Sequence, residues 1–323
     1  MKTSTALSTH SHGLAEVDAA LAAAEAASRT EHDKLRSAID ALGARVLALE
    51  TAEPPPDPEP SPIIDLQKAI DSAASGATLD LTGGTFACSG LTIRKPITLI
   101  AGHIDVASGN GITVLSRDVA LVKTALSGNQ TGQSCGIWAM KADGLMLDRI
   151  MVADWVYAGI MVLETVSGTV KGSLVTRIGM NAKGAANAYG IAISNLGGVQ
   201  SSDIAIVDNT VDGTPNWHGI DTHAGKNLRI TGNMIHRTNR AIFITSDNYG
   251  RNADNIEISR NLADTPTPRD DVRNTPPYNE VGITVVTGCT NVRGDANTLE
   301  GWPRGNAIDP QKSGAVFTNT VVR

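Results

Sequence analysis

The sequence predicts a mainly β protein, a right-handed parallel β-helix preceded by an N-terminal α-helical coiled coil. The β-helix is predicted by a repeated phrase that is clearest between Tyr189 and Asn261. Each copy begins with a small residue followed by isoleucine and contains three short β-like runs. The copies start 22 to 41 residues apart, at Gly111, Gly136, Gly159, Gly190, Gly219, Ala241, Gly282 and Ala307. Such a period indicates a solenoid or a propeller, and the shortest copy is too short for a propeller blade of ~40–45 residues.

A column of asparagines supports the same fold. They recur between the second and third runs of successive copies, at Asn209, Asn233, Asn261, Asn297 and Asn319. Asparagine tolerates the left-handed conformation of a sharp bend, and its amide can bond the backbone. Stacked in register, these amides can also bond one another, as in other stacked sheets. We therefore predict that the column has a structural role in the turns.

The alignment of the copies also predicts which side chains face outward, because alternate residues of a strand face opposite sides. The first isoleucines are predicted to face the core: Ile112, Ile137, Ile160, Ile191, Ile220, Ile242, Ile283 and Ile308. The residues that follow them are predicted to face outward: Thr113, Trp138, Met161, Ala192, Asp221, Phe243, Thr284 and Asp309.

One zone of this outward face is apolar. Trp138 and Met161 lie there, together with Met140 and Leu163 two residues further along their strands. Soluble monomers rarely expose an apolar patch of this kind. The sequence leaves two interpretations open: the patch is an interface between subunits, or a loop around Met180 covers it.

A second zone is polar and titratable. The stretch "WHGIDTH" brings Trp217, His218, Asp221 and His223 close together, and Arg240 is expected one coil further on. An aromatic ring beside polar groups is the combination that a sugar site uses. These five residues are the predicted carbohydrate-binding site, with a solvated strand face as the alternative.

The same zone is the predicted catalytic site, with Asp221 as acid and His223 as base. Hydrolysis of a glycosidic bond needs two carboxylates ~5–9.5 Å apart. The outward neighbours of Asp221 are Ala192 and Phe243, and strand spacings put Asp247 ~14 Å from Asp221. A carboxylate of the long insertion 263–281, Asp270 or Asp271, could complete a pair.

The first 62 residues predict a different organisation. Residues 14–50 carry apolar residues at alternating spacings of three and four, which is typical of a coiled coil, with one stutter. So narrow a stripe needs identical partner helices, although an amphipathic helix folded back on the β-helix is the alternative. Residues 51–62, "TAEPPPDPEPSP", form a proline-rich neck linker, and residues 63–323 form the capped β-helix.

Residues 1–13 contain His10 and His12. On an extended chain both imidazoles point to one side. One chain offers too few ligands for a metal, whereas three chains on a threefold axis would supply six nitrogens to an octahedral ion. We predict a metal ion, iron or zinc, on the axis of a trimer, with a solvated polar terminus as the alternative.

Composition excludes several classes of function. The net charge of −6 argues against nucleic acid as a partner. No apolar run is long enough to span a membrane, and the first residues lack the apolar region of a secretory signal. Cys88, Cys135 and Cys289 are widely spaced and predict reduced thiols without a zinc site.

The segment "LQKAIDSAASGATLDLTGGTF…LTIRKPITLIAG" resembles the opening of pectate-lyase-like β-helices, where a capping helix precedes the first strands. Phage tailspikes and many polysaccharide-active proteins share this opening. The order of His-x-His, coiled coil, neck and capped β-helix is similar to that of trimeric phage tail fibres and tailspikes. The "WHGIDTH" stretch is also similar to the mannuronan epimerase signature Tyr-Gly-x-Asp-Pro-His-Asp at Gly219, Asp221 and His223. The positions that depart from this signature are His218, Thr222 and Ala224.

The resemblance implies a homotrimeric tail fibre or tailspike of a phage or phage-like particle, made in the host cytoplasm and located in the virion tail. Its N-terminus, residues 1–13, would attach to tail baseplate or hub proteins, and its β-helix would bind host cell-surface polysaccharide. Two alternatives remain open from the sequence: a polysaccharide depolymerase (a lyase or glycoside hydrolase) and a purely structural fibre.

Overall fold

The computed structural model describes residues 65–323, apart from residues 131, 181–186, 267–279, 303–304 and 306. These residues belong to one compact unit, Ser61–Arg323. The predicted coiled coil, the neck linker and the His10 and His12 pair lie outside the described residues, as do Asp270 and Asp271.

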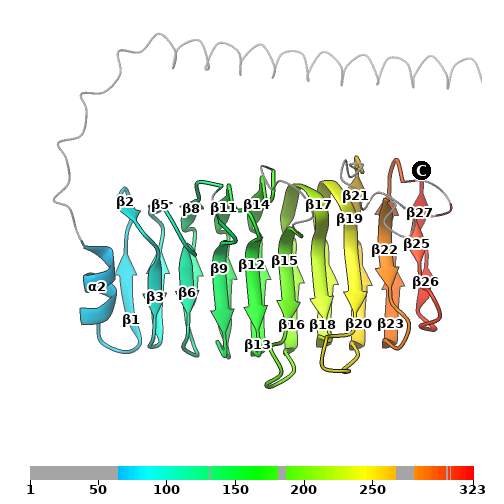
Figure 1. Cartoon of the computed structure of the whole chain (residues 1–323), viewed down its shortest axis with the longest axis horizontal. Helices are drawn as coiled ribbons and strands as arrows, with labels where there is room; N and C mark the ends of the chain where they lie inside the picture. Colours follow the sequence, from blue (N-terminus) through cyan, green and yellow to red (C-terminus); the bar gives the residue numbers. More distant parts are fainter. Residues whose placement is uncertain (1–64, 131, 181–186, 267–279, 303–304, 306) are drawn as a thin grey trace, which may run out of the picture. The chain divides into compact units, whose positions relative to one another are not determined.

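The described chain is a parallel β-helix with three faces. The strands of each face pair in parallel with the strands one coil before and one coil after (Figure 1). Face 1 consists of β1 (Ala77–Asp80), β4 (Ile97–Ile100), β7 (Ala120–Val122), β10 (Leu145–Asp148), β13 (Val166–Lys171), β16 (Ser202–Val207), β18 (Lys226–Thr231), β20 (Asp254–Ser259), β23 (Thr290–Asp295) and β26 (Val316–Thr318).

The other two faces share two long strands, β17 (Thr210–His223) and β19 (Met234–Thr245), whose first halves lie in face 2 and second halves in face 3. The remaining strands of face 2 are β2 (Thr85–Cys88), β5 (His103–Val106), β8 (Ala125–Ser127), β11 (Met151–Ala153), β14 (Leu174–Thr176), β21 (Leu262–Asp264), β24 (Thr298–Leu299) and β27 (Val321–Val322). Those of face 3 are β3 (Leu91–Ile93), β6 (Ile112–Val114), β9 (Cys135–Met140), β12 (Ala158–Leu163), β15 (Tyr189–Ser194), β22 (Val281–Val285) and β25 (Ile308–Asp309).

The isoleucine column predicted from the sequence is confirmed. The eight isoleucines are register partners from coil to coil along face 3. All are buried in the core except Ile308, in the last of these strands, which is partly buried. Leu91 pairs with Ile112 and extends the column by one coil that the sequence repeat missed, because leucine replaces isoleucine there.

Four of the five predicted asparagines form a ladder inside the coils. The Nδ2 atom of each donates to the Oδ1 atom of the next, at 3.0 Å from Asn209 to Asn233, 2.9 Å from Asn233 to Asn261 and 3.0 Å from Asn261 to Asn297. Each of these oxygens also accepts the backbone N–H of the preceding asparagine. All four side chains are buried. The ladder therefore satisfies polar groups that would otherwise be costly to bury.

The assignment of Asn319 to this column was wrong. The register of β23 with β26 places Asn319 beside Ala296, one residue before the ladder position. Asn319 has a φ of 49°, and the residues that precede ladder asparagines also have positive φ, with 55° at Asp208, 53° at Arg260 and 52° at Ala296. The left-handed bend and the amide ladder are thus two adjacent columns, which the sequence repeat does not distinguish because asparagine occurs in both.

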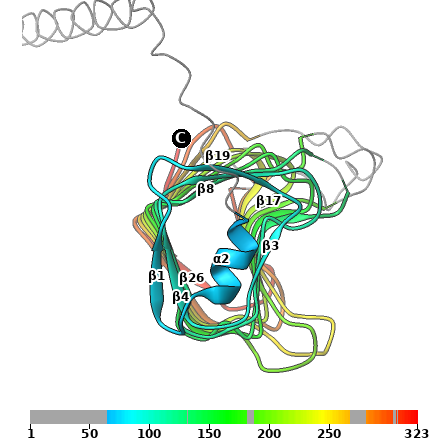
Figure 2. The ribbon, with the colours of Figure 1, turned by 90° about the vertical axis from the view of Figure 1, so that its left-hand side faces the viewer.

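The predicted capping helix is confirmed as α2 (Leu66–Ser72), which lies across one end of the coils (Figure 2). Asp65 is its N-cap and accepts the backbone N–H of Lys68 at 3.0 Å. Leu66 and Ile70 face the core and are buried. The helix thereby covers apolar core and strand edges that an open solenoid end would expose.

The apolar zone of face 3 is less exposed than predicted. Met161 and Leu163 are only 4% and 2% exposed, although they point away from the core. They pack with Trp138, Met140 and neighbouring rings in a second, smaller apolar cluster. Met180 is itself half exposed, and its sulfur lies close to Gly213 at the corner of β17. The predicted loop cover involves residues 181–186, which lie outside the described residues.

Candidate functional site

The candidate site is built on β17, which passes from face 2 to face 3 without a loop. The register with β19 is irregular between Thr214 and His218 at this corner. Gly219 follows directly, and a Cβ atom there would lie 2.8 Å from the carbonyl oxygen of Ala241. Only glycine permits so close an approach between the coils. The corner therefore positions the residues on either side of Gly219 within one short stretch of face 3.

His218, Asp221 and His223 lie together on the outside of face 3, joined by one hydrogen bond and one ion pair, and are hereafter the Asp221 cluster. His218 Nδ1 lies 2.5 Å from Asp221 Oδ2, and His223 Nε2 lies 3.1 Å from Asp221 Oδ1. The carboxylate is fully buried, and so is the imidazole of His218, whereas the side chain of His223 is 30% exposed. One carboxylate thus holds two imidazoles, of which only His223 reaches the solvent side.

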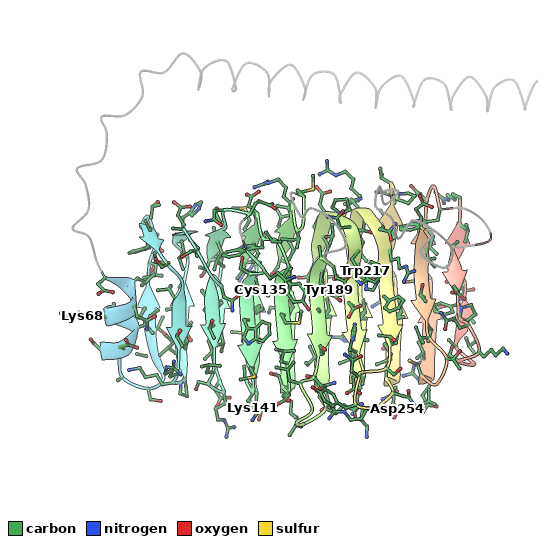
Figure 3. All side chains as sticks on the ribbon, viewed as in Figure 1. Lys68, Cys135, Lys141, Tyr189, Trp217 and Asp254 are labelled. Carbon is green, nitrogen blue, oxygen red and sulfur yellow. The ribbon has the colours of Figure 1, made fainter. Side chains whose placement is uncertain are left out.

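Aromatic rings enclose His218. Trp217 stacks on one side with ring centroids 4.6 Å apart, and Phe243 stacks with His218 at 4.2 Å. The Tyr189 ring meets His218 edge-on at 5.8 Å. The guanidinium of Arg240 lies 5.3 Å from the Trp217 ring centroid and 5.0 Å from that of Phe243. This packing fixes the orientation of His218 and, through it, that of Asp221. Figure 3 labels Tyr189 and Trp217 on neighbouring coils of this face.

The electrostatics assign different charges to the three groups. Burial lowers the pKa of His218 to about 4, so this imidazole is neutral at pH 7 and its Nδ1–H donates to Asp221. Burial opposes ionisation of Asp221, but the charge of His223 and the hydrogen bonds from both imidazoles outweigh it and lower the pKa of Asp221. The Asp221 carboxylate in turn raises the pKa of His223. The cluster is therefore an ion pair of Asp221 and His223, oriented by a neutral His218.

His223 faces a cleft of about 410 Å³. Its walls carry hydroxyl and amide groups and rings, among them Tyr157, Tyr189, Ser194, Asn195, Asp247 and Tyr249. Hydrogen bonds from the backbone and side chain of Arg251 and from the Tyr249 backbone outweigh burial and lower the pKa of Asp247. The cleft thus combines tyrosines, neutral hydrogen-bonding groups and two ionised carboxylates.

Residues 195–201 and 246–253 form two turns that project from the coils (Figure 2). Residues of both turns line one side of the cleft. Glu164 anchors the first turn by accepting the backbone N–H groups of Leu196 and Gly198. Gln200 joins the two turns by donating to the carbonyl oxygen of Asn252 at 3.0 Å. Tyr249 stays 58% exposed at the edge of the cleft. These bonds connect the turn that carries Tyr249 to the neighbouring turn, and the neighbouring turn to the coil below it.

All five residues of the predicted carbohydrate site lie close together in the structure, but only two of them line the cleft. Asp221 and His223 line the cleft. Trp217, His218 and Arg240 lie together behind them, where they support the Asp221 cluster.

The tyrosines of the cleft were not predicted from the sequence. Tyr189 pairs in register with His218, two residues before the isoleucine column, where strict alternation would place a side chain in the core. Its ring instead packs outside with Met161 and Leu163, so the alternation gave no signal for it. Tyr249 lies in a turn outside the repeat and gave no such signal.

Within the described ranges, no group of three or more histidine, cysteine, aspartate or glutamate residues is arranged to hold a metal ion. Asp221 already uses both of its oxygens on the two histidines. No helix in the described part of the chain is long and apolar enough to cross a membrane.

No protein-family model matches the chain, and no curated protein sequence matches it. Several solved structures are similar. An alginate lyase from Paenibacillus sp. str. FPU-7 is 14% identical over 79% of this chain and 96% of that one, with a TM-score of 0.47. The pectate lyase Pel9A is 14% identical over 79% and 70%, with a TM-score of 0.49. The Dettilon tailspike protein is 16% identical over 75% and 60%, with a TM-score of 0.41.

Proposed function

We propose that this protein binds a polysaccharide in the cleft beside His223. The observation that carries the proposal is a cleft of about 410 Å³ that combines tyrosines with amide and hydroxyl groups. Sugar rings pack their C–H faces on aromatic rings and exchange hydrogen bonds through their hydroxyls. Tyr249 offers an exposed ring at the edge, and Ser194 and Asn195 offer polar groups within the cleft.

The same proposal gives the Asp221 cluster a binding role. His223 presents a charged donor whose position is fixed by Asp221, so little entropy is lost when it bonds a sugar hydroxyl. His218, Trp217 and Arg240 hold this arrangement from behind. Of the five residues predicted from the sequence to touch sugar, His223 is thus the one that makes the contact, and the other four hold it in place.

We further propose that the chain acts as a trimeric tail fibre or tailspike of a virus-like particle that recognises host cell-surface polysaccharide. This part rests on residues 1–62: the His10 and His12 pair, the coiled-coil pattern and the proline-rich neck. Attachment to tail baseplate or hub proteins through residues 1–13, and iron or zinc bound by three copies of His10 and His12, belong to the same proposal. Sedimentation should give the mass of three chains, and a monomer mass would contradict it.

A second candidate function, a depolymerase, is favoured by the raised pKa of His223 beside Tyr189. In this version His223 exchanges a proton with the sugar, and Asp221 orients it. Asp221 itself is poorly suited to the role of acid predicted from the sequence, because its carboxylate is buried and its pKa is lowered. The raised pKa of Tyr189, caused by burial and by Asp221, keeps this phenol protonated and able to donate.

The test uses purified full-length protein and capsular or surface polysaccharide from the host. His223→Gln should weaken binding, whereas His236→Gln, which alters a His–Asp pair of similar geometry on face 2, should leave binding unchanged. Equal binding by all three proteins would overturn the proposal. Shortening of the polysaccharide by the wild type, lost in His223→Gln, would instead establish the depolymerase.

A further inference from the structure

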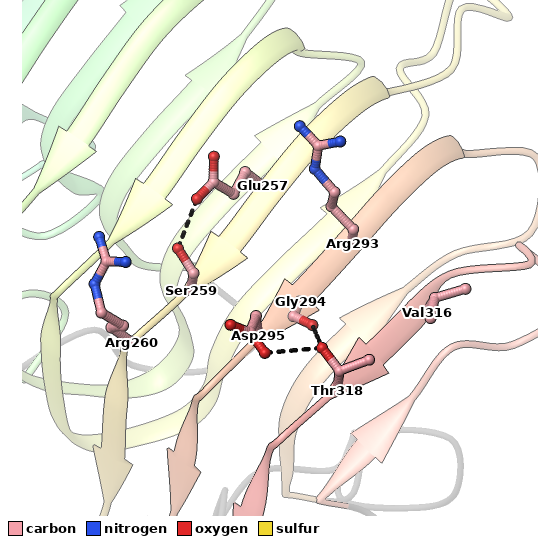
Figure 4. Close-up of a pocket in the computed structure, with 8 residues that line it drawn as sticks. All are labelled: Glu257, Ser259, Arg260, Arg293, Gly294, Asp295, Val316 and Thr318. Atoms are coloured by element: carbon pink, nitrogen blue, oxygen red, sulfur yellow. Dashed lines mark hydrogen bonds between the residues drawn. The ribbon is translucent and has the colours of Figure 1, made fainter.

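A second cavity lies on face 1, away from the Asp221 cluster (Figure 4). This groove has a volume of about 230 Å³, which suits one sugar unit rather than a long chain. Its walls come from β20, β23 and β26. Glu257, Arg293 and Val316 are register partners on successive strands. Ser259, Asp295 and Thr318 form a parallel row two residues further along.

The carboxylates of the groove are already engaged. Asp295 Oδ1 accepts the hydroxyl of Thr318 and the amide of Asn319, both at 2.8 Å. These bonds lower the pKa of Asp295, with a smaller contribution from the charge of Arg260. Glu257 accepts the Ser259 hydroxyl at 2.8 Å.

The arginines of the groove differ from four other arginines of the described chain. Arg149, Arg177, Arg237 and Arg251 each donate to an aspartate. By contrast, the guanidinium groups of Arg260 and Arg293 form no hydrogen bond or ion pair with any other described side chain. Figure 4 shows both guanidinium groups reaching out from the groove, with Glu257 between them.

We propose that this groove binds an acidic saccharide, with the negative group of the sugar held by Arg260 and Arg293. A guanidinium fork matches the two oxygens of a carboxylate or the oxygens of a sulfate. The exposed hydroxyl of Thr318 donates to Asp295 and can still accept a hydrogen bond from a sugar hydroxyl. Val316, which is 60% exposed, offers an apolar surface for the C–H face of the ring. The groove is independent of the cleft beside His223 and of the function proposed for that cleft.

The probe is an oligogalacturonate, and the readout is its affinity for the full-length protein by calorimetry. Arg260→Gln/Arg293→Gln should weaken binding by about tenfold or more, because two charge-assisted contacts are lost. Arg94→Gln/Lys68→Gln removes the same net charge at the α2 end and should change affinity by less than about twofold. Both arginines of the groove are exposed, so the double variant should unfold at the wild-type temperature.

Two further arms separate the possible sources of binding. A neutral malto-oligosaccharide should not compete, and inorganic sulfate at equal concentration should compete poorly. Equal loss of affinity in both double variants would overturn the proposal, since net charge alone would explain binding. Competition by sulfate as strong as that of the saccharide would also overturn it, because the groove would then be a simple anion site. His236→Gln, which lies on face 2 outside both cavities, should leave oligogalacturonate affinity unchanged.

Discussion

Two buried polar networks in this protein differ in a way that separates architecture from function. Inside the coils, Asn209, Asn233, Asn261 and Asn297 repeat the same neutral hydrogen bonds from one coil to the next. Outside face 3, the Asp221 cluster occurs within a single coil and carries charge. The asparagine ladder spreads its stabilisation along the solenoid, whereas the Asp221 cluster concentrates buried charge beside a cleft. A hydrogen-bond network that repeats from coil to coil stabilises the fold, whereas a group of titratable residues that occurs once indicates a functional site.

The largest effect on stability is expected from the ladder. Asn233→Ala removes two donated and two accepted hydrogen bonds, and it leaves the buried backbone N–H of Asn209 without its acceptor. The free energy of unfolding should fall by roughly 3 kcal/mol or more. Urea denaturation followed by circular dichroism measures this change. Polysaccharide affinity measured well below the unfolding transition should stay at the wild-type value, and its loss would show that the two networks are coupled.

A smaller loss of stability, but a loss of binding, is expected from Asp221→Asn. The substitution keeps the shape and removes the charge that pairs with His223, so the free energy of unfolding should fall by about 1–3 kcal/mol. The pKa of His223, followed by NMR, should fall because its largest upward influence is the Asp221 charge. An unchanged His223 pKa would contradict the ion pair.

The ion pair also predicts a pH window. Because the pKa of His223 is raised in the folded protein, its stabilisation is complete below the unfolded value of about 6.5 and disappears as pH rises through the folded pKa. Because the pKa of Asp221 is lowered, its contribution is present above the unfolded value of about 3.8 and disappears as pH falls through the folded pKa. The stability difference between wild type and Asp221→Asn should therefore be largest between these limits. A difference that is constant from pH 3 to pH 9 would count against the assignment of charges.

The smallest effect on stability is expected at the edge of the cleft. Tyr249→Ala removes a ring that is 58% exposed, so the free energy of unfolding should change by less than about 0.5 kcal/mol. Polysaccharide affinity should nevertheless fall about tenfold, because a stacking surface is lost. Met234→Ala, which truncates an exposed side chain on face 2, is the matched control for both measurements. Similar affinities for the two variants would remove Tyr249 from the site.

The sequence was sufficient for the register of face 3 and for the position of the Asp221 cluster. Strict alternation along short strands, repeated eight times, leaves little freedom in which residues face outward. The sequence did not predict how deeply the outward side chains are buried, because side chains such as Met161 pack on their neighbours in adjacent coils. The sequence also did not separate the column of left-handed residues from the asparagine ladder beside it, because asparagine occurs in both columns. The turn that carries Tyr249 lies outside the repeat, so no periodic signal could place it.

The in-register stacking of the isoleucine column has a consequence for the length of the molecule. Each coil adds one strand spacing of ~4.8 Å to every face, so the β-helix can lengthen only in steps of that size. A whole coil inserted between α2 and β9 would move the cleft and the groove away from the capped end together. Neither site would change its internal geometry, because each depends only on its own and adjacent coils. The distance from the capped end to the binding surfaces is therefore set by counting coils, separately from the chemistry of those surfaces.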